Sequence, residues 1–501
     1  MEKRITRIFW ISLALLTAIR LFVISTTMVV DDEAHYFVWS KHLALGYIDN
    51  GPVVAYLIRL STLLFGDNSF GVRVGGIIAS VALTIFLFRF ARKSFGALAG
   101  LVLTLLLGTS ILFFSSSFIL TPDTTMWIFM AVSLVYYYKA FMEDKRYFYP
   151  AGILFGIAAF SKVSVLFNGF GIFLFPFVVK EKRSFLKLKE FWLSFILAFL
   201  CFLPFIYWNI RNEYAFVSFK GTMAFRPGDI VNFLEFWGAQ VGFLFPILFG
   251  LVFYLPFKVL VPFFFRRKET ELKYLFFACA TIVPLLFFFL GSFNSRYEPY
   301  WSVPFCLSGV FLAGLYVADH WQKMRKWFYV QVSACVLAIL VMVVQIYCSL
   351  IPLPRIADGF RRYYKFTAFP GEIREFLATN TLCQSYRILA KNYQIPSMLI
   401  MYSHPKIEPS CVSVDGYHDT FFYTLHSDES LVGGDYLFLW KDEVMPSFFP
   451  QYFDSAEKVR TFHSYRRGEL IDTYTLWFVK NYRGKNAPER PKRAEAQGGK
   501  T

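Results

Sequence analysis

The stretch Ile8 to Val30, IFWISLALLTAIRLFVISTTMVV, is almost wholly apolar and ends directly at Asp31-Asp32-Glu33. It is long enough to cross the hydrocarbon core of a bilayer, which takes about 20 predominantly apolar residues. Charge beside a bilayer is costly unless it lies in a wet, polar cavity. The sequence therefore predicts a membrane-spanning helix, followed by carboxylates that are positioned for chemistry at the membrane surface.

The composition of the whole chain also indicates a membrane protein. Hydrophobic residues make up 56% of the 501 residues, charged residues only 17%, and 62 residues are Phe. Soluble domains are about 45–50% apolar and about 25% charged. Because the apolar residues come in long runs, we predict an α-helical polytopic membrane protein with a polar C-terminal part. The first run is too long for the core of a signal peptide and lacks a cleavage site, so we expect it to be retained.

The net charge of +16 predicts topology rather than nucleic-acid binding. Lysine and arginine cluster between apolar runs, whereas the short connection 109–124 contains neither. This positive-inside alternation predicts a multi-pass protein of the inner membrane, with a cytoplasmic N-terminus and an extracytoplasmic C-terminal part. The basic clusters are Arg89 to Lys93, Lys139 to Arg146, Lys180 to Lys189, Arg266 to Lys268 and Lys323 to Lys326.

The apolar runs divide into about eleven predicted spans. The stretch Tyr149 to Val179 is long for one upright helix and short for two. Basic runs on both sides require an even number of crossings, so we expect two short helices that meet near Ser161-Lys162. The predicted spans are 8–28, 74–89, 97–114, 124–140, 149–162, 165–179, 191–209, 236–265, 274–292, 301–318 and 327–351.

On this topology a large first external loop, 29–73, faces the connection 115–124 and the loops 211–233 and 292–300. Two parts of the first loop, 33–45 and 53–65, have the apolar spacing of amphipathic helices. The turn Asp49-Asn50-Gly51-Pro52 separates them. We expect both helices to lie in the membrane interface.

The composition changes near Pro352, where short mixed stretches replace the apolar runs. We therefore predict a membrane domain over 1–351, a small extracytoplasmic α/β domain over 352–480 and a disordered basic tail over 481–501. Cys383 and Cys411 lie in the exported domain, where a disulfide is an open alternative to free thiols. The predicted helices are 372–379 and 397–402, and the predicted strands are 387–390, 411–414, 436–440, 459–465 and 470–479.

Seven groups of residues between Arg4 and Leu350 form recognisable motifs. They are Asp32-Glu33-Ala34-His35-Tyr36-Phe37-Val38-Trp39-Ser40, Gly46 to Pro52, Phe65-Gly66-Asp67 with Gly71-Val72-Arg73, Thr121-Pro122-Asp123, Phe160-Ser161-Lys162, Trp208-Asn209 with Asn212 to Phe219, and Tyr300-Trp301-Ser302-Val303-Pro304. In sequence and order they resemble the motifs of bacterial protein-mannosyltransferase-like enzymes, which are related to the lipid A aminoarabinose transferases.

This resemblance implies a membrane glycosyltransferase of the GT-C class. Such an enzyme transfers a sugar from a polyprenyl-phosphate carrier to an acceptor on the outer face of the membrane. The acceptor hydroxyl must lose a proton, which a positioned carboxylate can accept. Cations or a divalent metal must stabilise the leaving phosphate. Lipid A, another envelope glycan and an exported protein all stay open as acceptors.

The resemblance singles out Asp32 as the base, with Glu33 as a second candidate. The alternative is that this acidic cluster only caps the helix that follows it. Asp123 is the next candidate carboxylate, because the family carries an acid at this position. Its alternative is also helix capping, since Thr121-Pro122-Asp123 opens a predicted helix.

Candidate cations for the donor phosphate are Lys162, Arg296, His35 and Arg59. Lys162 matches a family lysine, although it can also snorkel to the interface. Arg296 can instead pair with Glu298. His35 occupies a position where the aminoarabinose transferases have an arginine. Those enzymes have an acid and a lysine where this chain has Asn50-Gly51, so the usual phosphate lysine is missing and Arg59 is a possible substitute.

The rival class is a transporter or flippase of lipid-linked sugars. An intramembrane lysine and an external acidic cluster suit a transporter. However, the sequence shows no paired, interrupted half-helices in two matching repeats. The asymmetric first loop and the exported domain favour an enzyme that acts on an outside acceptor.

Overall fold

The computed structural model describes residues 1–224, 227–266, 269–351, 358–402, 408–412, 414, 421–422 and 428–484. The predicted tail beyond Gly484 lies outside these residues, as does part of the predicted strand 411–414. The chain divides into two compact units. Unit 1 contains residues 1–29 and 39–352, and unit 2 contains residues 30–38 and 353–501. Helix α2 (Asp31–Lys41) therefore has residues in both.

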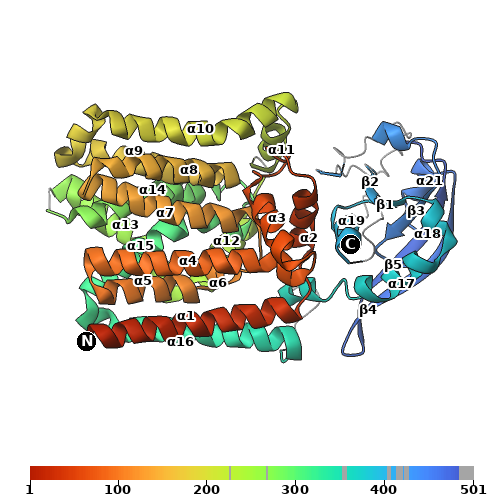
Figure 1. Ribbon diagram of the computed structural model, residues 1–501, viewed down its shortest axis with the longest axis horizontal. Coiled ribbons are helices and arrows are strands. Elements are labelled where there is room, and N and C mark those ends of the chain that lie inside the picture. Colours follow the sequence, from red (N-terminus) through yellow and green to blue (C-terminus); the bar gives the residue numbers. More distant parts are fainter. Residues whose placement is uncertain are drawn as a thin grey trace, which may run out of the picture. The chain divides into compact units, whose positions relative to one another are not determined.

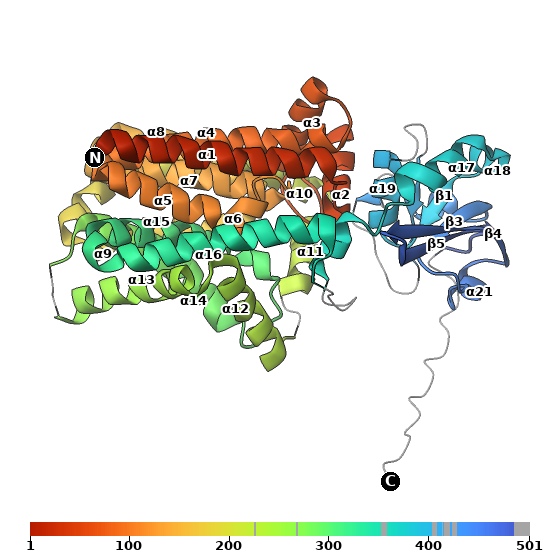
Figure 2. The same cartoon turned by 90° about the horizontal axis from the view of Figure 1, so that it is seen from below.

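Unit 1 is a bundle of helices whose long members run along a common direction (Figures 1 and 2). Its helices are α1 (Glu2–Thr26), α3 (Val53–Phe65), α4 (Ser69–Phe95), α5 (Ala97–Thr109), α6 (Ile111–Ser115), α7 (Pro122–Met142), α8 (Phe148–Ser161), α9 (Leu166–Val178), α10 (Lys189–Arg211), α11 (Ala215–Ala224), α12 (Ile230–Leu244), α13 (Pro246–Arg266), α14 (Leu272–Gly291), α15 (Val303–Asp319) and α16 (Trp321–Cys348).

The structure confirms a polytopic helical fold but not the predicted number of spans. Among the described residues, seven helices are long and apolar enough to cross a membrane, or eight if the bent pair 163–178 and 180–187 forms one span. Several predicted spans are short helices, such as α5 with 13 residues and α8 with 14. The predicted single span 236–265 is broken at Phe245, whose φ is +64°, before Pro246 starts α13.

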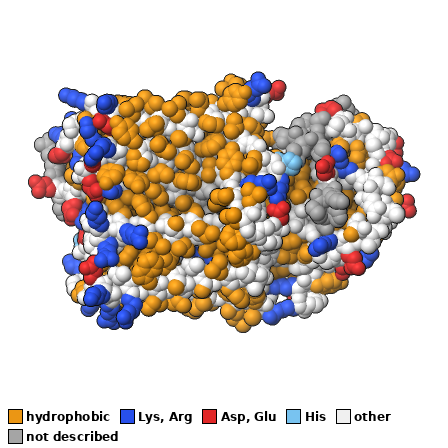
Figure 3. Space-filling model, in the orientation of Figure 1, with side chains coloured by type: hydrophobic (Ala, Val, Ile, Leu, Met, Phe, Trp, Pro, Cys, Tyr) orange, Lys and Arg blue, Asp and Glu red, His pale blue; other side chains and the backbone are white. Residues whose placement is uncertain are grey.

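Basic side chains gather at the end of unit 1 where the chain begins. Figure 3 shows Lys and Arg at this end, beside a broad band of hydrophobic side chains. Arg92, in the last turn of α4, pairs with Glu2 at the start of α1. Lys145 pairs with Glu190 at the start of α10. Two of the basic connections that the sequence predicted on one side of the membrane, those near Arg92 and Lys145, therefore lie at one end of the bundle.

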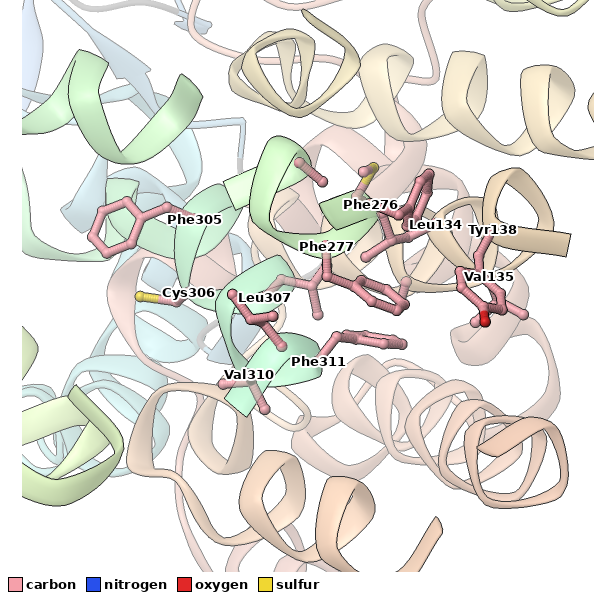
Figure 4. Close-up of a cluster of buried hydrophobic side chains, with 14 of the residues drawn as sticks. Leu134, Val135, Tyr138, Phe276, Phe277, Phe305, Cys306, Leu307, Val310 and Phe311 are labelled. Carbon is pink, nitrogen blue, oxygen red and sulfur yellow. The ribbon is translucent and has the colours of Figure 1, made fainter. Parts of the chain in front are cut away.

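The centre of unit 1 is packed with aromatic and aliphatic side chains from α7, α14 and α15 (Figure 4). Phe277 stacks on Tyr138 with 5.5 Å between ring centroids, and on Phe311 with 5.3 Å. Pro284 has no N–H to donate to the carbonyl of Ala280, four residues earlier in α14. The side-chain amide of Asn168 on α9 donates to that carbonyl at 3.1 Å and to the carbonyl of Pro304 at 2.9 Å. This single side chain thus joins three helices.

Two predicted features of the connections are confirmed. Helix α3 occupies 53–65 as predicted, and its exposed apolar residues include Leu60, Leu63 and Leu64. The helices α8 and α9 meet at Lys162, which has extended backbone, and the short 3-10 helix η2 (Val163–Val165) follows it.

A β-bridge between Pro227 and Ser295 joins the loops before α12 and after α14.

Unit 2 contains a mixed five-stranded sheet in the order β2-β1-β3-β5-β4. The strands are β1 (Ile388–Ala390), β2 (Ser410–Cys411), β3 (Tyr436–Trp440), β4 (Ser455–Arg466) and β5 (Glu469–Lys480). Strand β1 runs parallel to β2 and β3, whereas β5 is antiparallel to β3 and β4. The predicted α/β character is therefore confirmed. The helices α17 (Arg374–Thr379), α18 (Thr381–Ser385), α19 (Gln394–Tyr402) and α21 (Phe449–Tyr452) accompany the sheet.

Strands β4 and β5 form a hairpin that turns at Arg467-Gly468, between the predicted strands 459–465 and 470–479. Both residues have positive φ, +51° and +84°, which matches the right-handed twist of a two-residue hairpin turn. One face of the sheet packs Leu389, Phe438 and Trp477 into a core with Phe449 of α21. Cys383 and Cys411 are both buried free thiols, so the open alternative of a disulfide is not realised.

Candidate active site

The predicted site residues Asp123 and Lys162 lie together in unit 1. The Nζ atom of Lys162 donates to both carboxylate oxygens of Asp123, at 2.8 and 2.7 Å. The pair is buried, with side chains only 7% and 10% exposed. A buried lysine is stabilised by such a pair, whereas removal of one partner leaves an uncompensated charge. The two residues therefore form one polar group inside an apolar bundle.

Local sequence explains why both side chains reach this point. Asp123 lies in the first turn of α7, which starts at Pro122 after Thr121. The hydroxyl of Thr124 accepts the N–H of Thr121 at 3.2 Å, so a threonine performs the reciprocal capping. The carboxylate of Asp123 is directed to Lys162 instead. Lys162 leaves the helical path at the junction of α8 and η2, because its φ is −158°.

Lys220 on α11 and Asp49 of the first loop add two more charges to this region. The pKa of Lys220 is lowered to about 8, mainly by burial and also by the charge of Lys162, although Asp49 and Asp123 act in the opposite direction. Aromatic rings surround the two lysines. The Nζ of Lys162 lies 5.1 Å from the ring centroid of Tyr300, and that of Lys220 lies 5.5 Å from Phe219 and 6.0 Å from Trp301. We call Asp49, Asp123, Lys162 and Lys220 the four-charge cluster.

The sequence interpretation missed Lys220 and assigned no role to Asp49. The available signal for Lys220 was its position as the single charged residue of the apolar segment Ala215 to Ala224. The structure also explains why this chain has a glycine at position 51, where the aminoarabinose transferases have a lysine. A Cβ atom at Gly51 would lie 1.7 Å from the carbonyl oxygen of Phe160, so no side chain fits there. A lysine at position 51 is incompatible with this packing.

Asp32 lies in unit 2, at the first turn of α2. Its Oδ2 accepts from Nη2 of Arg362 at 2.5 Å, and its Oδ1 accepts from the hydroxyl of Tyr393 at 2.8 Å. The side chain is 33% exposed, so it is accessible to solvent. Asp32 is therefore a hydrogen-bonded carboxylate held by residues of the C-terminal part of the chain.

The neighbours of Asp32 are more enclosed. Glu33 is fully buried, and its Oε2 accepts the N–H of Val30 at 3.0 Å, which is a helix-capping contact. His35 is buried among Tyr393, Phe421 and Phe422, and its Nδ1 lies 3.4 Å from the hydroxyl of Ser397. Burial lowers the pKa of His35 to about 3, so its imidazole is neutral at neutral pH.

Arg59 and Arg296 do not join these groups through any ion pair within the described residues. Arg59 is half-buried on α3, and Arg296 is exposed in the loop that follows α14. The alternative pairing of Arg296 with Glu298 is also not seen there. No group of three or more His, Cys, Asp or Glu side chains suited to a metal occurs in the described part of the chain.

Comparisons with known proteins agree with this architecture. Residues 49–208 match the family model of dolichyl-phosphate-mannose-protein mannosyltransferases, a range that includes Asp49, Gly51, Asp123 and Lys162. A curated relative, the lipid A galacturonosyltransferase RgtD of Rhizobium johnstonii, is 25% identical over 303 residues. That alignment covers 58% of this chain and 61% of the relative, so the chain spans less than two thirds of its length.

Two solved structures have the same fold, both of ArnT from Cupriavidus metallidurans. The apo structure matches with a TM-score of 0.64 and 13% identity, over 93% of this chain and 97% of ArnT. The structure with bound undecaprenyl phosphate matches with a TM-score of 0.62 and 13% identity, over 93% and 98% of the two chains. The fold is therefore that of ArnT. The chain is similar to the protein-mannosyltransferase family model, to RgtD and to ArnT, which confirms the predicted resemblance.

Proposed function

We propose that this protein is an integral-membrane glycosyltransferase that moves a sugar from a polyprenyl-phosphate donor to an acceptor on the outer face of the membrane. The observation that carries the proposal is the four-charge cluster. Two lysines and two carboxylates are expensive to place in an apolar bundle, and such groups are functional candidates by default. The family match covers three of the four residues.

Lys220 is the residue proposed to bind the donor phosphate. Within the described residues no carboxylate lies at ion-pair distance from its ammonium group, whereas Lys162 is already paired with Asp123. The lowered pKa of Lys220 reflects its partial removal from water. A phosphate would place a negative charge in direct contact with this ammonium. Lys220 thereby replaces the phosphate-binding lysine of the aminoarabinose transferases, which cannot fit at position 51.

Lys162 is proposed to act mainly in the transition state. When the bond between the anomeric carbon and the phosphate oxygen breaks, the leaving phosphate gains negative charge. A positioned ammonium stabilises that charge without reorganisation, and Asp123 holds Lys162 in place until then. Arg59, Arg296 and His35 are secondary candidates for contacts with the donor. A divalent metal is a further candidate, with its ligands unassigned.

The second half of the reaction requires a base, for which we propose Asp32. The acceptor hydroxyl oxygen forms a bond to the anomeric carbon, its proton passes to the carboxylate of Asp32, and the polyprenyl phosphate leaves with the electrons of the broken bond. Glu33 is the less suitable choice, because it already accepts a backbone N–H.

The acceptor and the sugar are proposed from the curated relative, which is named a lipid A galacturonosyltransferase. Lipid A or a similar envelope glycolipid is therefore the first acceptor to test, with a uronic acid as the first sugar. The family description names a protein acceptor, so an exported protein is the second candidate. No feature of the structure or the comparisons favours a transporter.

The proposed orientation places the basic end of unit 1 in the cytoplasm and unit 2 outside. It follows the positive-inside rule, because the basic connections gather at the N-terminal end of the bundle. The proposed location is the inner membrane of a bacterium.

Purified protein in detergent tests the function directly. Polyprenyl phosphate-linked galacturonic acid and lipid A are mixed with the protein, and the product is identified by mass spectrometry. We expect a mass increase of one sugar on the acceptor and release of polyprenyl phosphate. Detergent micelles have no inside, so a transporter gives no signal. If a panel of polyprenyl-phosphate sugars yields no transfer to lipid A or to exported proteins, the proposal is wrong.

A further inference from the structure

The segment Asp358 to Lys365 holds both carboxylates at the start of α2, and we call it the strap. Arg362 of the strap donates to Oδ1 of Asp31 from Nε at 3.0 Å and from Nη2 at 2.6 Å. The same Nη2 donates to Oδ2 of Asp32 at 2.5 Å. Lys365 donates to the other oxygen of Asp31 at 2.7 Å. One guanidinium group thus bridges two adjacent acids.

Asp31 and Asp32 differ in exposure and in their remaining capacity to accept hydrogen bonds. Asp31 is 4% exposed and bound by both strap cations. Burial alone would raise the pKa of Asp31, but the charges of Arg362 and Lys365 lower it below its usual value. Asp32 is more exposed, and each of its oxygens accepts one hydrogen bond. Because a carboxylate oxygen can accept two, Asp32 keeps room for a substrate hydroxyl.

The strap is itself fixed to the sheet of unit 2. Arg361 forms an ion pair with the buried Asp472 of β5 and donates to the carbonyl of Ile471 at 2.9 Å. The hydroxyl of Tyr474, also on β5, donates to the carbonyl of Lys365 at 3.0 Å. Neighbouring strap residues therefore face opposite ways, with Arg361 joined to the sheet and Arg362 joined to the acids.

We propose that Arg362 is a positioning residue for the transfer reaction. It uses Asp31 as a buried anchor and so fixes the orientation of Asp32, the proposed base. An arginine suits this task because its planar fork can contact two carboxylates at once, which the point charge of lysine does less well. This role rests on the proposed function, and it makes the C-terminal part of the chain necessary for turnover. The strap connects the sheet of unit 2 to Asp32 and thereby fixes the orientation of this proposed base.

The test compares Arg362→Met and Arg362→Lys with a matched control in the full-length protein. The control is Arg483→Met, because Arg483 of the same unit pairs with Asp454 at 2.5 Å and is similarly exposed. Two experiments are performed on each variant. The first measures kcat and the donor KM of the transfer reaction. The second measures amide hydrogen exchange in peptides that cover residues 31–38.

We expect Arg362→Met to lower kcat at least about tenfold with little change in donor KM, because misplacement of a base affects the chemical step. Exchange over residues 31–38 should rise in the same variant. Arg362→Lys should be intermediate, and Arg483→Met should match the unaltered protein in both measurements.

Three results would overturn the proposal. Faster exchange with normal kcat would mean that Arg362 only stabilises the fold. A lower kcat with unchanged exchange would mean that Arg362 acts on the substrate itself. A higher kcat would mean that Arg362 restrains the base. Absence of transfer by the unaltered protein is a separate outcome, since it would overturn the proposed function and this role with it.

Discussion

Lys162 and Asp123 are 39 residues apart in the sequence, yet the lysine Nζ lies 2.8 and 2.7 Å from the two carboxylate oxygens. Each was predicted separately to be functional, and each had a structural alternative. The pairing weakens both alternatives, because the carboxylate of Asp123 accepts from Lys162 while Thr121 and Thr124 form the cap of α7, and because the side chain of Lys162 is buried. It also means that neither residue can be altered without an effect on the other.

Lys162→Met tests the role of this pair in the transition state. Methionine keeps the packing of the stem but removes the charge. We expect kcat to fall by more than the donor KM rises, because the phosphate gains charge as it leaves. Steady-state kinetics with varied donor measures both. If only KM rises, Lys162 holds the donor in its ground state, and if neither changes, its role is structural.

Asp32→Asn tests the proposed base. Asparagine preserves the size of the side chain but cannot accept the proton, so we expect activity to fall about a hundredfold or more. The protein should still insert into the membrane and purify normally. Initial rates at saturating donor and acceptor give the comparison. Near-normal transfer by this variant would exclude Asp32 as the base.

Lys220 predicts a particular pH dependence. Its pKa is lowered to about 8, so its ammonium is charged below that pH and neutral above it. A donor phosphodiester does not titrate in this range, so the donor KM should rise as the pH increases above 8. Lys220→Arg keeps its charge at all these pH values and should give a flat profile. The proposed role of Lys220 is wrong if the donor KM depends on pH in the same way in the unaltered protein and in Lys220→Arg.

Gly51→Ala tests the close contact beneath the first-loop turn. A Cβ atom there would overlap the carbonyl of Phe160, so the turn must shift. We expect a loss of about 1–3 kcal/mol in the free energy of unfolding, as for other overpacked sites, together with weaker donor binding. Gly238→Ala is the control, because no atom lies within 4 Å of its Cβ position on α12. Thermal unfolding in detergent compares the stability of the two variants. Equal unfolding midpoints would show that the contact at Gly51 can relax.

Cysteine labelling tests the proposed orientation. A cysteine placed between Lys180 and Lys189 should be shielded from an impermeant thiol reagent in intact cells, because this basic connection is proposed to be cytoplasmic. A cysteine at Gly468, in the hairpin turn of unit 2, should react. The reverse pattern would invert the orientation. Labelling after permeabilisation confirms that both cysteines are reactive.

The sequence predicted the parts of the fold that depend on local pattern. Helix α3 and strand β3 follow from apolar periodicity and residue type, and the structure has them where they were expected. The predicted number of spans is not confirmed. The break at Phe245-Pro246 lies within a continuous apolar run, where hydropathy carries no signal.

The candidate site was predictable only in part, because the sequence around a residue does not show which distant residue contacts it. Asp123 and Lys162 were identified one by one, whereas their ion pair depends on how α7 and α8 pack. Lys220 was overlooked because one lysine in an apolar segment resembles a snorkelling residue. Arg362 lies in a region without any matched motif, so only the folded chain shows that it reaches Asp31 and Asp32.

The side chain of Asn168 has a mechanical consequence for the four-charge cluster. It lies six residues after Lys162 and bonds to the carbonyl of Pro304, four residues after Tyr300. Through Ala280 it also fastens α14. The side chain of Asn168 thus connects the backbones near Lys162 and Tyr300. We therefore expect that a bulky donor displaces other segments, such as α11 with Lys220, rather than this junction.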